Sequence, residues 1–163
     1  MIMSYIFNRR IVAVLFLGFS SGLPLALSGG TLQAWLTVEG IDIKTIGMFT
    51  LVGLPYTLKF FWAPFVDRFV FPLFGRRRGW ILVFQSLLLI LIFAMSLVSP
   101  AKAPWILAFL AFGLAFASSS QDIVIDAYRT EVLRDKERGF GAAVSVTGYR
   151  VAMLISGALA LIL

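Results

Sequence analysis

The sequence lacks cysteine and histidine and is poor in charge. Of its 163 residues, 13% are charged and 60% are hydrophobic. Without cysteine there is no disulfide framework and no thiolate nucleophile, and without histidine zinc and haem lose their usual ligands. A soluble domain carries about 25% charged and 45–50% apolar residues. The composition therefore excludes a soluble globular protein and predicts no metal site.

Charge is absent from three long apolar runs, which extend from Ile11 to Val38, from Gly79 to Ala101 and from Ala103 to Gln121. An apolar run of about 18 residues or more is long enough to cross a bilayer as a helix. The sequence therefore predicts an all-α, polytopic helical bundle in a membrane. Its five expected spans are residues 10–36, 45–66, 80–99, 104–128 and 140–163.

The basic residues fall mostly on one side of these spans. Ten lie on one side, namely Arg9, Arg10, Arg68, Arg76, Arg77, Arg78, Arg129, Arg134, Lys136 and Arg138. The other side has Lys44 and Lys102. Because basic loops stay in the cytoplasm, this asymmetry predicts a cytoplasmic amino terminus. The basic residues behind the formal net charge of +6 then serve to orient the chain in the membrane. We therefore expect the lipid bilayer, not nucleic acid, as a partner.

Five is an odd number of spans, and the fifth ends with the chain at the outer face. We therefore expect residues 1–163 to be an incomplete amino-terminal bundle, whose remaining carboxy-terminal helices are its partner. Two ridges of small residues predict close helix contacts in lipid. They are Gly18, Gly22, Ala26 and Gly30 in the first span, and Gly141, Ser145, Gly148, Ala152 and Ser156 in the fifth. Pro24 should kink the first span, and Pro55 and Pro64 the second.

Four ionisable residues fall within the expected spans, where charge is costly and marks candidate functional groups. They are Lys59, Asp122, Asp126 and Arg150. Asp122 and Asp126 form one helical stripe with Ser118 and Arg129, which must face protein or a water-filled cavity. The two hypotheses are a shared polar cavity and buried ion pairs, such as Asp122 with Arg150, that only fix the order of the helices.

Uncharged polar and aromatic residues near these charges are further candidates for a substrate or proton pathway. They are Gln33 at the end of the first span, Tyr56 one turn before Lys59, and Gln121 at the edge of the charged stripe. Amides can bind hydroxyl groups, and aromatic rings can pack against the apolar faces of sugars.

The loop after the second span carries a dense set of charges. Asp67 and Arg68 end the span, and Gly75, Arg76, Arg77 and Arg78 precede the third. By itself this pattern favours simple positive-inside anchoring, and the alternative is a cytoplasmic charge latch that pairs with another helix end.

The same loop is similar to the G-x-L-x-D-R-x-G-R-R signature of the major facilitator superfamily, with Ala63 in place of the first glycine and residues 70–74 inserted. Other segments resemble the AmpG-type muropeptide permeases of that superfamily over nearly the whole chain. These segments are Ser20–Leu27, Thr31–Trp35, Phe74–Trp80, Ser120–Ala127, Glu137–Gly139 and Gly148–Arg150.

The resemblance implies the first five transmembrane helices of a major facilitator fold in a bacterial inner membrane. It implies a secondary active transporter, not an enzyme, that imports anhydro-muropeptides from periplasm to cytoplasm. The transport would serve peptidoglycan recycling and, indirectly, β-lactamase induction. The proton gradient would drive it, without a cofactor or catalytic residue. Gln121, Asp122 and Asp126 match the family motif, and Lys59 or Arg150 would hold an anionic peptide carboxylate of the substrate.

Three alternatives stay open. The family has eukaryotic relatives associated with acetyl-coenzyme A, so the substrate does not follow from the fold. A non-transporting membrane scaffold would use the buried charges only to order its helices. A membrane-embedded acyl- or glycosyltransferase is the least favoured, because the sequence has no histidine, no cysteine and no paired carboxylates beside an obvious acceptor site.

Overall fold

The computed structural model describes residues 8–69 and 75–162. These residues form helices joined by short turns, with no strand among them, so the predicted all-α class is confirmed. The longest helices are α2 (Arg9–Ala26), α7 (Arg76–Ser96), α8 (Pro104–Val132) and α9 (Arg138–Ile162). Four helical segments of the described chain are long and apolar enough to cross a membrane, namely Arg9–Val38, Arg77–Ser96, Pro104–Val132 and Asp135–Ala158.

The segment at residues 45–66, expected to be one span, is helical but interrupted. Its pieces are α4 (Ile43–Met48), a 3₁₀ turn (Phe49–Gly53), α5 (Leu54–Leu58), a second 3₁₀ turn (Lys59–Phe61) and α6 (Ala63–Arg68). Pro55 and Pro64 each lie in the first turn of a new α-helical piece. A proline is tolerated there, because the first backbone N–H groups of a helix have no partner within it. The two prolines therefore begin new pieces and divide the segment, which is not among the four long apolar helices.

The first span bends at Gly29 and not at Pro24, so the expected position of the kink is wrong. Pro24 lies buried inside the continuous helix α2. A π-helical turn (Leu27–Thr31) follows, in which Gly29 has the non-helical angles φ −100° and ψ −110°, and α3 (Leu32–Val38) continues beyond it. Glycine adopts such angles easily because it has no Cβ.

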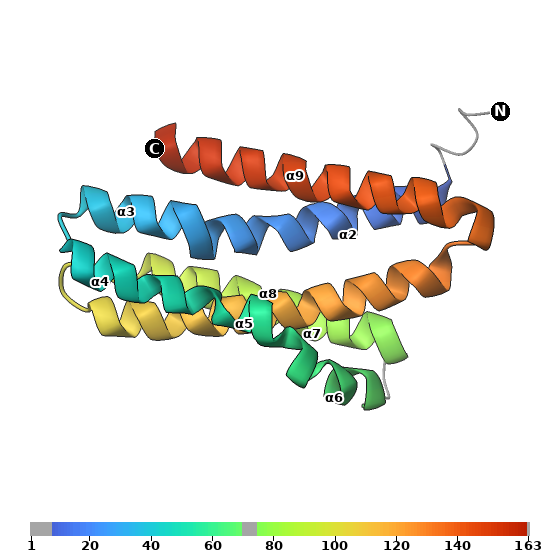
Figure 1. The fold of residues 1–163 in the computed structure, drawn as a ribbon, viewed down its shortest axis with the longest axis horizontal. Coiled ribbons are helices and arrows are strands. Elements are labelled where there is room, and N and C mark those ends of the chain that lie inside the picture. The colour runs from blue at the N-terminus through green and yellow to red at the C-terminus, as the bar shows by residue number, and fades with distance from the viewer. Residues whose placement is uncertain (1–7, 70–74, 163) are drawn as a thin grey trace.

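Helices α2 and α9 pack with their backbones in close contact, as the two ridges of small residues predict. A Cβ atom built on Gly18 would collide with the carbonyl oxygen of Ser145, and one on Gly22 with that of Tyr149. A Cβ on Gly148 would collide with the carbonyl oxygen of Leu15. Gly30 has no such neighbour. Figure 1 shows α9 lying along α2 over most of its length.

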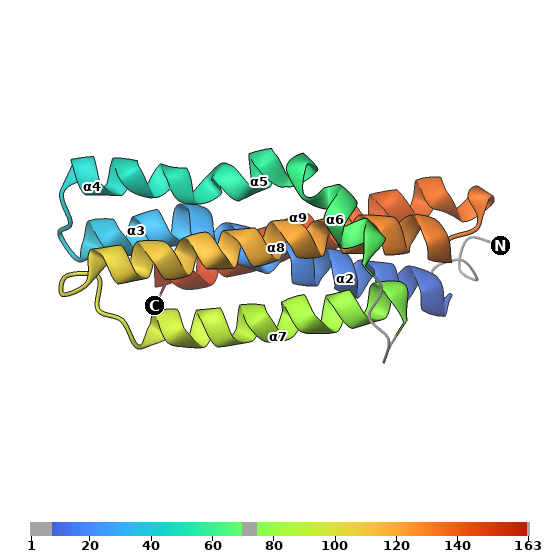
Figure 2. The same ribbon diagram turned by 90° about the horizontal axis from the view of Figure 1, so that it is seen from below.

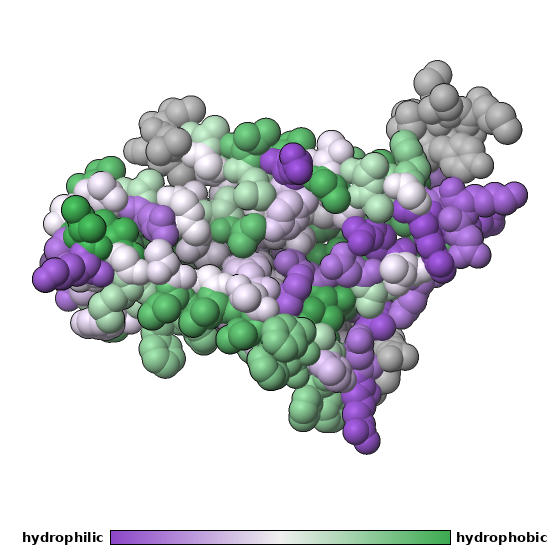
Figure 3. All heavy atoms as spheres, in the orientation of Figure 1, coloured by the Kyte–Doolittle hydropathy of each residue, from purple (hydrophilic) through white to green (hydrophobic). Residues whose placement is uncertain are grey.

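Helix α8 lies at the centre of the bundle. It contacts α2, α7 and the interrupted segment, and Figure 2 shows it between α7 and the α4–α6 pieces. Its inward positions form much of the apolar core, including the fully buried Leu107, Ala111 and Leu114. Figure 3 shows hydrophilic surface gathered at the two ends of the bundle, most of it where α2 begins, with largely apolar surface between.

Candidate functional site

A cavity of about 730 Å³ lies among α2, α8, α9 and the 3₁₀ turn at Lys59. Its lining residues are Gly18, Ser21, Lys59, Asp122, Ile125, Asp126, Arg129, Ser145, Val146, Tyr149, Arg150, Met153 and Leu154. Cavities that hold small-molecule ligands commonly measure about 300–1,000 Å³. The volume lies within this range.

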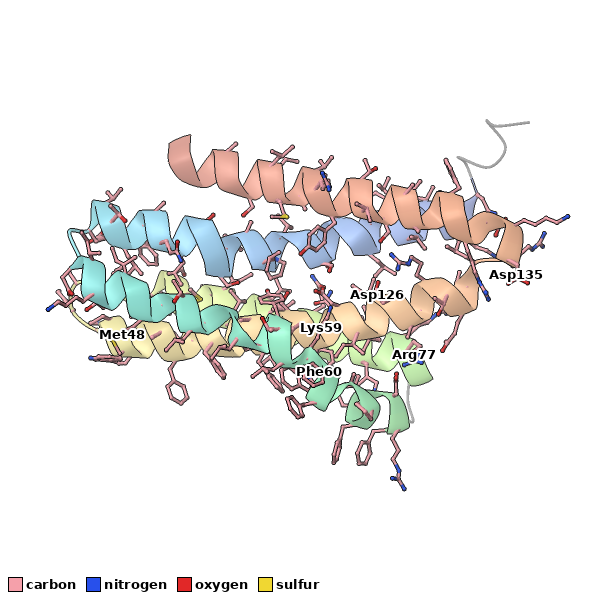
Figure 4. The ribbon with its side chains drawn as sticks, viewed as in Figure 1. Met48, Lys59, Phe60, Arg77, Asp126 and Asp135 are labelled. Carbon is pink, nitrogen blue, oxygen red and sulfur yellow. The ribbon has the colours of Figure 1, made fainter. Side chains whose placement is uncertain are left out.

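The structure brings the four charged residues of the expected spans together at this cavity. Lys59 comes from the interrupted segment, Asp122 and Asp126 from α8, and Arg150 from α9. Figure 4 shows the Lys59 and Asp126 side chains directed toward the space between α8 and α2. Arg129 adds a third cation. The walls thus carry two carboxylates and three cations on three elements.

The two carboxylates have different partners. Asp126 forms an ion pair with Arg129 one helical turn later, at 3.1 Å. Asp122 accepts a hydrogen bond from Ser21 Oγ on α2. In the described part of the chain Asp122 has no cation within ion-pair distance, so the hypothesised Asp122–Arg150 pair does not form there.

Three consecutive residues of α8 bond to three different parts of the bundle. Ser120 Oγ accepts from Trp62 Nε1 at 3.0 Å, Gln121 Nε2 donates to Gln85 Oε1 of α7 at 2.7 Å, and Asp122 accepts from Ser21 of α2. Successive residues of an α-helix point about 100° apart, which directs each toward another neighbour. Gln121 therefore bonds to α7 and is not part of the cavity lining.

Sequence reasoning missed the partners of Gln121. Gln85 Oε1 also accepts from Ser20 Oγ at 2.8 Å, and Gln121 Nε2 lies 3.3 Å from the same Ser20 Oγ. The signal for Gln85 was present, because an amide inside the uncharged run of residues 79–101 needs a polar partner in lipid. Its partners could not be read from spacing, since they lie on two other helices.

Two further candidates, Gln33 and Tyr56, lie outside the cavity lining. Gln33 is half-buried on α3, where its backbone carbonyl accepts a hydrogen bond from Thr37. The Tyr56 hydroxyl is buried against α8, with Ser118 and Ser28 as its polar neighbours.

The charged loop forms a three-helix ion cluster. Arg77 at the start of α7 pairs with Asp67 at the end of α6, and its Nε lies 2.9 Å from Glu131 Oε1 near the end of α8. Gly75, just before α7, has φ +83°, a conformation that favours glycine. Arg68 and Arg78 are exposed, and the side chain of Arg76 and residues 70–74 lie outside the described part. The sequence offered a pairing with another helix end only as the alternative to simple anchoring, and it did not identify Glu131 as the partner.

No group of three acidic, cysteine or histidine residues that could hold a metal occurs within residues 8–69 and 75–162. The cavity lining carries carboxylates, cations, hydroxyls and the aromatic ring of Tyr149. Such groups bind charged and hydroxyl-bearing ligands, and the carboxylates can also carry protons.

Comparison with known proteins gives relatives that include a named permease and a putative transporter. The chain is 59% identical to the anhydromuropeptide permease of Escherichia coli K12 over 93% of its own length and 31% of that protein. It is 39% identical to putative transporter AmpG 4 of Rickettsia felis, over 96% of this chain and 38% of that one. An uncharacterized protein of Haemophilus influenzae is 46% identical over 98% and 38% of the two chains.

The chain thus spans about a third of the length of these relatives. Residues 10–104, more than half of the chain, match the family model described as acetyl-coenzyme A transporter 1. With its long apolar helices, the chain is part of a multi-pass membrane protein that resembles the AmpG-type permeases. It belongs to the acetyl-coenzyme A transporter 1 family of membrane transporters.

Proposed function

We propose that the protein to which this chain belongs imports anhydro-muropeptides from periplasm to cytoplasm across a bacterial inner membrane, driven by protons. The amino terminus lies in the cytoplasm. The observation that carries the proposal is the 730 Å³ cavity whose walls hold two carboxylates and three cations. The 59% identity to a protein named anhydromuropeptide permease supports the substrate class.

In this proposal the two carboxylates have different roles. Asp122 carries the coupling proton, because releasing a proton there or binding one breaks no ion pair among the described residues. Asp126 is already paired with Arg129. In an alternating-access cycle Asp122 takes a proton from the periplasmic side and releases it to the cytoplasm. The membrane potential contributes about 2.3 kcal/mol per charge for each 100 mV to this inward movement.

The cations bind the substrate in this proposal. Lys59 of the 3₁₀ turn and Arg150 of α9 both line the cavity and have no ion-pair partner in the described chain. A carboxylate of the muropeptide can take that place, with charge-assisted hydrogen bonds that exceed neutral ones in strength. Tyr149 lies beside Arg150 in the same wall and offers an aromatic surface to a sugar ring.

The experiment is uptake of labelled anhydro-disaccharide by cells that lack their own importer and express the complete protein. We expect uptake that a protonophore abolishes. Asp122→Asn should remove proton-driven uptake at an unchanged protein level, because an amide cannot carry the proton. Asp135→Asn is the matched control, since Asp135 is an exposed carboxylate in the turn between α8 and α9.

Unchanged uptake in both Asp122→Asn and Asp126→Asn would refute the coupling scheme. Absence of uptake in the unaltered protein, at a normal protein level, would refute the substrate.

Acetyl-coenzyme A is the second candidate substrate, because the matching family model carries that name. It is also an anion, so Lys59 and Arg150 could bind it in the same cavity. Proteoliposomes loaded with a labelled form of either compound separate the two. Exchange of acetyl-coenzyme A without exchange of the anhydro-disaccharide would favour this second substrate.

A further inference from the structure

Gln85 is a polar residue with no role in the proposed transport cycle. It lies near the middle of α7, among the uncharged residues 79–101, and it does not line the cavity. An amide in a membrane-spanning helix needs hydrogen-bond partners on its neighbours. Gln85 has two of them, and they lie on two different helices.

Its side-chain oxygen joins three helices at one point. Gln85 Oε1 accepts from Ser20 Oγ of α2 at 2.8 Å and from Gln121 Nε2 of α8 at 2.7 Å. Gln121 is fully buried, and its Nε2 also lies 3.3 Å from Ser20 Oγ. Both donors share one acceptor. Without Gln85 Oε1, the Ser20 hydroxyl and the Gln121 amide each lose this hydrogen bond. A buried donor without an acceptor destabilises the folded state.

This three-helix contact is adjacent in sequence to the contact that holds Asp122. Ser20 and Ser21 are consecutive on α2, and Gln121 and Asp122 are consecutive on α8. The first pair meets at Gln85, and the second pair forms the Ser21–Asp122 hydrogen bond in the cavity wall. The two contacts therefore share one backbone register between α2 and α8.

We propose that Gln85 is a positioning residue. By accepting from Ser20 and Gln121 it fixes α2 against α8, and so holds the Asp122 carboxylate at Ser21 in the cavity wall. The inference rests on the proposed function of Asp122 in proton coupling. Gln85 itself touches neither the proton nor the substrate.

The test is carbodiimide labelling of the complete protein in membranes, because carbodiimides react with the protonated form of a carboxyl group. The rate is followed separately at Asp122 and Asp126 by mass spectrometry of peptides, at fixed neutral pH. Besides Asp126, the charged and titratable groups around Asp122 are Lys59, Arg129, Tyr149 and Arg150 in the cavity lining and Tyr56 beside it, and the variants leave all of them in place.

We expect Gln85→Leu to increase the labelling rate of Asp122 several-fold, because a carboxylate that loses its donor is protonated more readily. The rate at Asp126 should not change, since Asp126 is held by Arg129 on its own helix. Ser20→Ala removes one of the two donors and should give a smaller change in the same direction. Ser20→Ala also tests the proposal if Gln85→Leu fails to fold. Ser86→Ala, an exposed position next to Gln85, is the matched control and should label as the unaltered protein does.

An unchanged Asp122 rate in both variants would overturn the proposal, and so would an equal change at Asp122 and Asp126, which would indicate general loosening of the bundle. Labelling requires no transport. A selective change at Asp122 in a protein without muropeptide uptake would therefore refute the proposed function and leave the positioning inference standing.

Discussion

At the scale of the residue, helical spacing predicted which side chains are functional candidates but not what they touch. The steps of four between Ser118, Asp122 and Asp126 put the two carboxylates in one cavity wall, while Ser118 is fully buried against other protein. Gln121 lies one position from Asp122 yet bonds to α7. The difference is tertiary, because neighbouring helices decide whether a side chain meets water or protein.

Lys59 and Arg150 give the prediction at this scale. If they bind the substrate carboxylate, Lys59→Gln and Arg150→Gln should each raise the KM for anhydro-disaccharide uptake by about tenfold, the equivalent of about 1.4 kcal/mol. The maximal rate should change less, because Asp122 is untouched. Lys102→Gln is the control, since Lys102 is exposed in the turn between α7 and α8. Equal KM values in all three variants would contradict the assignment.

At the scale of the element, apolar runs located the long helices well. The ridges of small residues predicted close backbone contacts for the first and fifth spans, and the structure shows that these two helices contact each other. The irregular elements were harder to predict. Pro24 was the obvious helix breaker, but the non-helical angles occur at Gly29, where no side chain opposes them. The segment at residues 45–66 is apolar enough to suggest one helix, but its prolines begin new pieces and 3₁₀ turns separate them.

The contact of α2 with α9 predicts a difference between two glycines. Gly18→Ala should lower the stability of the protein by about 1–3 kcal/mol, because its Cβ would collide with a backbone carbonyl that cannot move alone. Gly157→Ala on α9 meets no atom within 4 Å and should be neutral or stabilising. Thermal unfolding of the two variants in detergent measures the difference. Equal melting temperatures would show that the helices do not approach so closely.

At the scale of the whole molecule, the asymmetry of basic residues predicted how the chain is oriented across the membrane. In the structure, hydrophilic surface lies at the two ends of the bundle (Figure 3). The central position of α8 was not predictable, because its apolar positions resemble those of a lipid-facing helix. Its many buried residues are explained by the interrupted segment and α7, which pack against it.

The proposed orientation has a direct test in cells. Lys102 and Lys136 lie in exposed turns, before α8 and after it, and this chain has no cysteine of its own. With a cytoplasmic amino terminus, Lys102→Cys should react with a membrane-impermeant maleimide added to the periplasmic side, whereas Lys136→Cys should react only after lysis. The unaltered protein measures the background. The reverse pattern would place the amino terminus in the periplasm.

The backbone contact between α2 and α9 also bears on how hydrophobic molecules reach Asp122. With Gly18, Gly22 and Gly148 at the seam, the two helices approach too closely for an acyl chain to pass between them. That seam acts as a lateral seal on one side of the cavity. A lipophilic inhibitor dissolved in the bilayer must therefore enter by another face.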